Sequence, residues 1–119
     1  ISWVNGGHQP ALLRDKNGKF EQVESAAPPM GVIQQKNKSL YKINRTKLNG
    51  KRFYAFTDGL SESLDSKGNE IGIEGSIKII EKNFNDDVSK QLSNIAKDVE
   101  KSSGKNKLSD DLTLIAIGK

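Results

Sequence analysis

The sequence predicts an α+β fold with a mainly antiparallel sheet and helices on one face of it. Three observations support this prediction. Short apolar runs alternate with turn signals as far as Thr57, which is typical of antiparallel strands. Beyond Gly72 the apolar residues recur at helical spacing. A last apolar run, Leu112–Ile117, closes the chain as a strand. Strands followed by helices favour a layer of helices over a sheet.

Strands are expected first at Trp3–Val4, Ala11–Arg14 and Phe20–Glu24, and then at Ser39–Lys47 and Arg52–Thr57. Asn-Gly pairs at 17–18 and 49–50 predict tight hairpin turns, because both residue types accept a positive φ. Pro28 and Pro29 interrupt the sheet between these groups of strands, since proline has no N–H to donate to a ladder.

The second half predicts two helices and a final strand. We expect the first helix at Ile73–Lys82, and we expect Asp86 or Asp87 to cap the second. The second helix has apolar residues on one face at Val88, Leu92, Ile95, Ala96 and Val99. It ends at residues 102–104. The nearly continuous apolar run Leu112–Ile117 predicts a central strand, buried on both faces.

Composition excludes several classes of function. At 119 residues the chain fits a single domain. It contains no cysteine, which excludes disulfides, thiolate zinc sites and a cysteine nucleophile, and is consistent with a cytoplasmic location. No apolar run approaches the ~20 residues of a membrane span, so we expect a soluble chain without membrane contact. The net charge is +4 with scattered lysines and 6% aromatic residues, which disfavours nucleic acid binding.

Two acidic segments are candidates for binding a metal. Asp58 and Gly59 directly follow the predicted strand Arg52–Thr57. Asp58 is either a metal ligand or an ordinary turn aspartate that accepts backbone N–H groups. Asp110 and Asp111 immediately precede the last strand, where they either bind a hard cation or simply begin the strand at the surface. Carboxylate oxygens from both segments would suit Mg²⁺ or Mn²⁺.

The segment 5–10, Asn-Gly-Gly-His-Gln-Pro, holds the only histidine, His8, beside two glycines. Glycines allow the backbone to approach another chain segment or a phosphate closely. A lone histidine has either a structural role or a chemical one, and the pattern leaves both open. No serine–histidine–acid order or nucleotide-binding loop is found.

Five segments, in order, resemble those of the PPM-type phosphatases of the SpoIIE/RsbU branch, a bacterial group. Residues 5–13 are similar to its Asn-Ala-Gly-His-x-Pro-x-Leu-Leu and residues 29–32 to its Pro-Leu-Gly-Val. Residues 56–63 resemble Tyr-Thr-Asp-Gly-Leu-Thr-Glu-Ala and residues 68–72 resemble Gly-Glu-x-Phe-Gly. Residues 109–114 resemble the closing Asp-Asp-Ile-Thr-Leu strand. The five segments together extend over nearly the whole chain.

The resemblance implies part of an αββα sandwich with an Mn²⁺ or Mg²⁺ pair at one edge. Asp58 and Asp110 match the family's metal ligands, and Asp111 takes the neighbouring position, which is often asparagine in related phosphatases. Gly59 then lies beside the metal site, and His8 is a substrate-side or structural residue. The family's upstream segment, which carries the aspartate that bridges the two metals, has no counterpart. We therefore expect residues 1–119 to be the C-terminal portion of one phosphatase domain, with an incomplete two-metal site.

The resemblance also implies a function. The family contains serine/threonine protein phosphatases of bacterial signalling, in which a metal-activated water attacks the phosphoryl group. By analogy, the substrate is a phosphorylated anti-anti-sigma-like regulator of a partner-switching pathway, and a sensor or receiver domain precedes the phosphatase. We expect this segment alone to be inactive. The alternative is a degenerate phosphatase domain that binds a partner protein without hydrolysis, and an upstream bridging aspartate would argue against it.

Overall fold

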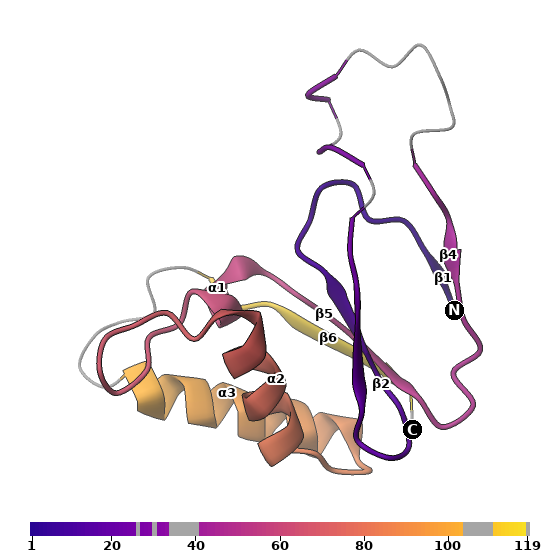
Figure 1. Ribbon diagram of the computed structural model, residues 1–119. Coiled ribbons are helices and arrows are strands. Elements are labelled where there is room, and N and C mark those ends of the chain that lie inside the picture. The colour runs from indigo at the N-terminus through magenta and orange to yellow at the C-terminus, as the bar shows by residue number, and fades with distance from the viewer. Residues whose placement is uncertain (26, 30, 34–40, 104–110, 119) are drawn as a thin grey trace.

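The computed structural model describes residues 1–25, 27–29, 31–33, 41–103 and 111–118. They form a four-stranded antiparallel sheet of order β3-β2-β5-β6, a two-stranded ribbon β1-β4, and helices (Figure 1). The strands are β1 (Ser2–Trp3), β2 (Ala11–Arg14), β3 (Phe20–Val23), β4 (Asn44–Arg45), β5 (Arg52–Phe56) and β6 (Leu114–Gly118). The helices are α1 (Asp58–Ser61), α2 (Gly72–Lys82) and α3 (Val88–Ser103).

One face of the four-stranded sheet packs against α2 and α3, and α2 crosses α3 in the view of Figure 1. Leu12 and Tyr54 are opposite each other in the central strands and are both fully buried. They pack with Phe56, Leu60, Ile80, Ile95 and Val99 in one core. Alternate residues of a strand point to opposite faces, so this core uses only every second position of β2 and β5. The predicted α+β fold with helices on one face of an antiparallel sheet is confirmed.

The opposite face of the sheet is apolar, and within the described residues no helix covers it (Figure 1). Leu13 and Phe53 are buried there, and the Trp3 ring lies 5.0 Å from the Phe53 ring between centroids. On β6, Ile115 and Ile117 remain 51% and 42% exposed. The sheet therefore has one face covered by helices and one face that is partly exposed to solvent.

A buried polar cluster fixes the α2–α3 connection to the sheet. Arg52, which is 1% exposed, donates hydrogen bonds at 2.6 Å to the main-chain oxygen of Asn85 and to Gln91 Oε1. Tyr54 donates to the same Gln91 oxygen at 3.1 Å, and Gln91 Nε2 donates to the main-chain oxygen of Ile80 at 3.1 Å. A buried guanidinium is tolerated because these oxygens compensate its lost hydration.

Two aspartate turns share one arrangement. Asp15 Oδ1 accepts the N–H groups of Asn17 and Lys19 at 2.8 and 2.9 Å, and Gly18 has a φ of +83°. Asp65 accepts the N–H groups two and four residues after it in the same way. These hydrogen bonds stabilise the carboxylate form, so the pKa of Asp15 and the pKa of Asp65 both lie below their ordinary value.

Two expectations about strand pairing were wrong. The turn at Asn49 and Gly50 forms with positive φ at both residues, but β4 pairs with β1 rather than with β5. The described part of the predicted strand Ser39–Lys47 is a strand only at Asn44–Arg45, and residues 39–40 lie outside the described ranges. The strand β6 is an edge of its sheet instead of a central strand. Its continuous apolar pattern arises because both faces are apolar, one against the helices and one on the open face.

None of the helices in the described part of the chain combines the length and the apolar character that crossing a bilayer requires.

Candidate metal centre

Asp58 lies immediately beyond the end of the central strand β5. The strand ends at Phe56, Thr57 is extended with φ −73° and ψ 163°, and α1 begins at Asp58. The Asp58 side chain is exposed, and among the described residues it has no hydrogen-bond or ion-pair partner. Its carboxylate thus differs from those of Asp15 and Asp65, which accept backbone N–H groups in their turns, and both alternatives for Asp58 stay open.

Thr57 joins the Asp58 turn to the segment that leads into β6. Its hydroxyl donates a hydrogen bond to the main-chain oxygen of Asp111 at 3.0 Å and accepts one from the N–H of Thr113 at 3.0 Å. Its own N–H donates to the main-chain oxygen of Thr113 at 3.0 Å. The contact between β5 and β6 is thus continued by one more residue pair, Thr57 with Thr113, directly before Asp58.

Gly59 approaches the same segment from the other side of Asp58. An added Cβ at Gly59 would lie 2.5 Å from the main-chain oxygen of Asp111, a distance that no side chain tolerates. Both neighbours of Asp58 therefore contact the backbone of Asp111, and the two acidic segments meet at one end of the sheet. Asp110, the other predicted ligand, lies outside the described residues.

The segment Asn5–Pro10 is held beside the Asp58 turn. Gln9 Oε1 accepts a hydrogen bond from the Ser61 hydroxyl at 2.9 Å, and Gln9 Nε2 lies 3.4 Å from the main-chain oxygen of Phe56. The side chain of Asn5 accepts the N–H of His8 at 2.8 Å, which shapes the loop. The His8 imidazole is exposed, with Nδ1 3.4 Å from the main-chain oxygen of Gln9. His8 thus lies on a loop bonded to the candidate centre, and its role stays a prediction.

The glycines at positions 6 and 7 were expected to allow close approach of another chain segment or of a phosphate, and Gly7 shows which of these lies nearby. It has a φ of +80°, and an added Cβ would lie 2.4 Å from the backbone nitrogen of Pro29. The close neighbour is therefore another chain segment. Two of the motif segments, residues 5–13 and 29–32, touch at this point.

The donor chemistry of the site fits Mg²⁺ or Mn²⁺, while the number of donors does not complete a site. Asp58 and Asp111 offer carboxylate oxygens, the ligands that hard cations prefer. In the described ranges no group of three or more His, Asp or Glu side chains could hold a metal ion. Such cations take about six oxygen ligands, so two carboxylates would leave several positions for water or for donors outside the described residues. The metal-binding role of Asp58, Asp110 and Asp111 stays a prediction.

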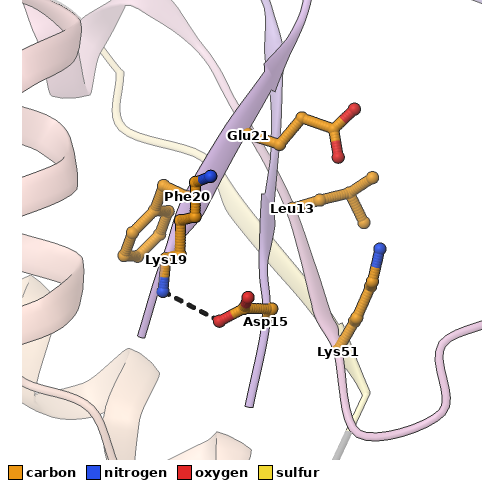
Figure 2. Close-up of a pocket in the computed structure, with 6 residues that line it drawn as sticks. All are labelled: Leu13, Asp15, Lys19, Phe20, Glu21 and Lys51. Atoms are coloured by element: carbon orange, nitrogen blue, oxygen red, sulfur yellow. Dashed lines mark hydrogen bonds between the residues drawn. The ribbon is translucent and has the colours of Figure 1, made fainter. Parts of the chain in front are cut away.

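A pocket of about 330 Å³ lies at the other end of β5, beside the Asp15 turn (Figure 2). Leu13, Glu21 and Lys51 line it together with Asp15, Lys19 and Phe20. Figure 2 shows the hydrogen bond that the Lys19 N–H donates to the Asp15 carboxylate. The turn therefore already uses this carboxylate. The pocket is remote from Asp58 along the strand and is not part of the candidate centre.

The sequence did not reveal the contacts that hold the centre together. The predicted site residues do not include Gln9, Thr57 or Ser61, although each bonds a segment that carries a predicted residue. Thr57 and Ser61 flank Asp58 inside a recognisable motif, so their position was a usable signal. Gln9 occupies a position where the family pattern specifies no residue, and no signal pointed to it.

Comparisons with known proteins bear on the family and the fold. The family model described as stage II sporulation protein E (SpoIIE) matches residues 1–119. The SiaA-PP2C domain of Pseudomonas aeruginosa is similar in fold, with a TM-score of 0.76 at 16% identity over 97% of this chain and 45% of that chain. The RsbU and RsbW domains of Rv1364c from Mycobacterium tuberculosis give a TM-score of 0.63 at 23% identity over 97% of this chain and 31% of that chain.

The chain thus spans less than half the length of both solved structures. A search of the curated proteins found no match. Because the family model extends over every residue, the chain belongs to the SpoIIE family, and its fold is similar to that of a PP2C domain.

Proposed function

We propose that this chain contributes the Asp58 and Asp110–Asp111 metal ligands to a serine/threonine protein phosphatase of bacterial signalling. One observation supports this most directly: the two neighbours of Asp58, Thr57 and Gly59, both contact the main chain of Asp111. Two acidic segments more than fifty residues apart in sequence therefore meet at one sheet end. In a member of a phosphatase family, that arrangement suits a shared cation site.

A bound Mn²⁺ or Mg²⁺ pair lowers the pKa of a coordinated water and neutralises charge on the phosphoryl oxygens. The role of this chain is to orient the ligands for that pair. Asp58 presents an exposed carboxylate from the start of α1, and Thr57 fixes the distance of that turn from the strand β6. No side chain here is assigned to proton transfer. The exposed His8 imidazole is a substrate-side candidate on the adjoining loop.

The proposed substrate is a phosphoserine or phosphothreonine on an anti-anti-sigma-like regulator in the cytoplasm. Family membership supports the class of reaction, and partner switching as its setting follows from the resemblance to the SpoIIE/RsbU branch. We propose further that the remaining metal ligands, including a bridging aspartate, lie elsewhere in a longer protein. The 119-residue segment by itself then hydrolyses phosphate esters negligibly.

The test compares Asp58→Asn and Asp110→Asn in the full-length protein, with Mn²⁺ and a phosphoserine peptide as substrate. Each variant should abolish turnover, since each removes a charged ligand of the proposed site. The folded state should persist, because removing a carboxylate from an acidic cluster relieves repulsion. Asp86→Asn, at an exposed acid before α3, is the matched control and should retain full activity.

Wild-type turnover in both site variants would refute the metal assignment. An inactive wild-type protein that still binds the unphosphorylated regulator would instead support a non-catalytic binding module. Turnover by the isolated 119-residue chain near that of the full-length protein would contradict the proposal that further ligands lie elsewhere.

A further inference from the structure

The side chain of Gln9 contacts both flanks of the turn that carries Asp58. Its Oε1 accepts the hydroxyl proton of Ser61, the last residue of α1, at 2.9 Å. Its Nε2 donates toward the main-chain oxygen of Phe56, the last residue of β5, at 3.4 Å. One carboxamide therefore connects the residue two before Asp58 with the residue three after it.

The Ser61 hydroxyl has a choice of acceptors. It lies 2.9 Å from Gln9 Oε1 and 3.2 Å from the main-chain oxygen of Asp58. A hydroxyl has one proton to donate, so only one of these bonds is made at a time. With Gln9 present the shorter bond ties α1 to the Asn5–Pro10 loop. Without it the hydroxyl would turn back onto its own helix, and the Asp58 turn would lose this link.

The loop that carries Gln9 is itself fixed, so its side chain is a firm support. Asn5 Nδ2 donates to the main-chain oxygen of Gln9 at 2.9 Å, and Asn5 Oδ1 accepts the N–H of His8. Ser25, just beyond β3, accepts the N–H of Gly7 at 2.9 Å. Residues that hold a functional side chain act best when their own positions are locked by such bonds.

We propose that Gln9 is a positioning residue that holds the Asp58 carboxylate in place for the cation, acting through Ser61 and Phe56. This inference rests on the proposed function, because it concerns the same cation site. Gln9 touches neither the cation nor the substrate in this role. Its predicted effect is on the affinity of the site for the metal and not on recognition of the phosphoprotein.

The test uses the full-length protein with Gln9→Met, which keeps the side-chain length and removes the carboxamide, and with Ser61→Ala. Ser61→Thr is the conservative variant, since it retains the hydroxyl. Gln22→Met on the exposed edge strand β3 and Ser93→Ala on the exposed side of α3 are matched controls. Three experiments are made: calorimetry gives the dissociation constant for Mn²⁺, steady-state kinetics with a phosphoserine peptide give kcat and KM, and amide hydrogen exchange is followed in the turn.

Gln9→Met and Ser61→Ala should each weaken Mn²⁺ binding by about tenfold, the lower end of the effect of removing support from a metal ligand. The double variant should be no weaker than Gln9→Met, because Ser61→Ala removes a bond that Gln9→Met has already removed. Ser61→Thr should restore wild-type affinity. KM for the peptide should stay unchanged, and saturating Mn²⁺ should recover most of kcat.

Amide hydrogen exchange tests the hydrogen bond between Gln9 and Ser61 without depending on a bound metal. The N–H groups of Leu60 and Glu62 bond the main-chain oxygens of Thr57 and Asp58 within the turn. Their exchange should be faster in Gln9→Met than in Gln22→Met, in protein without added metal.

Unchanged Mn²⁺ affinity in Gln9→Met, measured against a wild-type protein that binds Mn²⁺, would overturn the positioning role. Additive losses in the double variant would overturn it as well, because the two residues would then act separately. A wild-type protein that binds no Mn²⁺ would end the proposed function and the role of Gln9 within it. In that case faster exchange in Gln9→Met would identify the metal assignment, and not the link, as the error.

Discussion

The hydroxyl of Thr57 donates a hydrogen bond to the main-chain oxygen of Asp111 at 3.0 Å, across 54 residues of sequence. Thr57→Val keeps the shape of the side chain and removes this bond, together with the acceptor for the Thr113 N–H. We expect a loss of about 1–2 kcal/mol in the free energy of unfolding and weaker Mn²⁺ binding. Urea unfolding and Mn²⁺ calorimetry of the full-length protein measure both. Thr46→Val, which removes only a 3.3 Å bond to the next residue, is the control, and an equal loss there would contradict the prediction.

Gly59 is required by the approach of Asp111 and not by its backbone conformation. In Gly59→Ala the new Cβ would have to displace the main-chain oxygen of Asp111, which otherwise lies 2.5 Å away. Overpacking of this kind costs about 1–3 kcal/mol, and here it also moves one acidic segment away from the other. We expect reduced stability and reduced Mn²⁺ affinity together.

Gly68→Ala separates these two effects. Gly68 has a φ of +82° with nothing within 4 Å of an added Cβ, so alanine there strains only the Asp65 turn. It should lower stability by about 1 kcal/mol and leave Mn²⁺ affinity unchanged. A Gly59→Ala protein with wild-type Mn²⁺ affinity would show that the spacing of the two segments is unimportant.

Gln91 holds the buried cluster around Arg52. Gln91→Leu removes the acceptor shared by Arg52 and Tyr54 and leaves both donors short of a partner in the core. We expect a loss of about 2–3 kcal/mol in the free energy of unfolding. Asn94→Leu, on the exposed side of the same helix, should change it by less than about 0.5 kcal/mol. Equal urea midpoints for the two variants would argue against this role of Gln91.

The turns at Asp15 and Asp65 predict how stability depends on pH. The folded-state pKa of each carboxyl is lowered, chiefly by hydrogen bonds from backbone N–H groups. Their contribution to stability is therefore complete above the unfolded pKa of about 3.9 and is lost as the pH falls through the folded-state pKa. Replacing both with asparagine should reduce the loss of stability between pH 5 and pH 3. Urea unfolding across this range checks it, with Asp86→Asn as the control that should follow the wild type.

The local sequence pattern predicted those strands and helices whose own residues show the apolar spacing of that element. The strand Ala11–Arg14 was predicted with its observed bounds, and the first helix differs from α2 only by Gly72. Pairing was harder to predict, because the Asn49–Gly50 turn fixes the local backbone without choosing a partner for β4. The edge position of β6 was missed since an apolar run does not tell a doubly apolar edge strand from a central one.

The candidate metal centre likewise has residues that the sequence predicted and contacts that it did not. Asp58 and Asp111 could be selected because acids at strand ends beside apolar runs are unusual. The bond between Gln9 and Ser61 joins positions 52 residues apart and leaves no periodicity in the sequence. Contacts of this kind depend on tertiary structure alone.

The single tryptophan of the sequence, Trp3, packs at 5.0 Å on Phe53 over the open face of the sheet. Indole fluorescence responds to the polarity around the ring, so this residue is a built-in optical reporter. Docking of a further layer onto that face, or detachment of the β1–β4 ribbon, would shift its emission in opposite directions without any attached label.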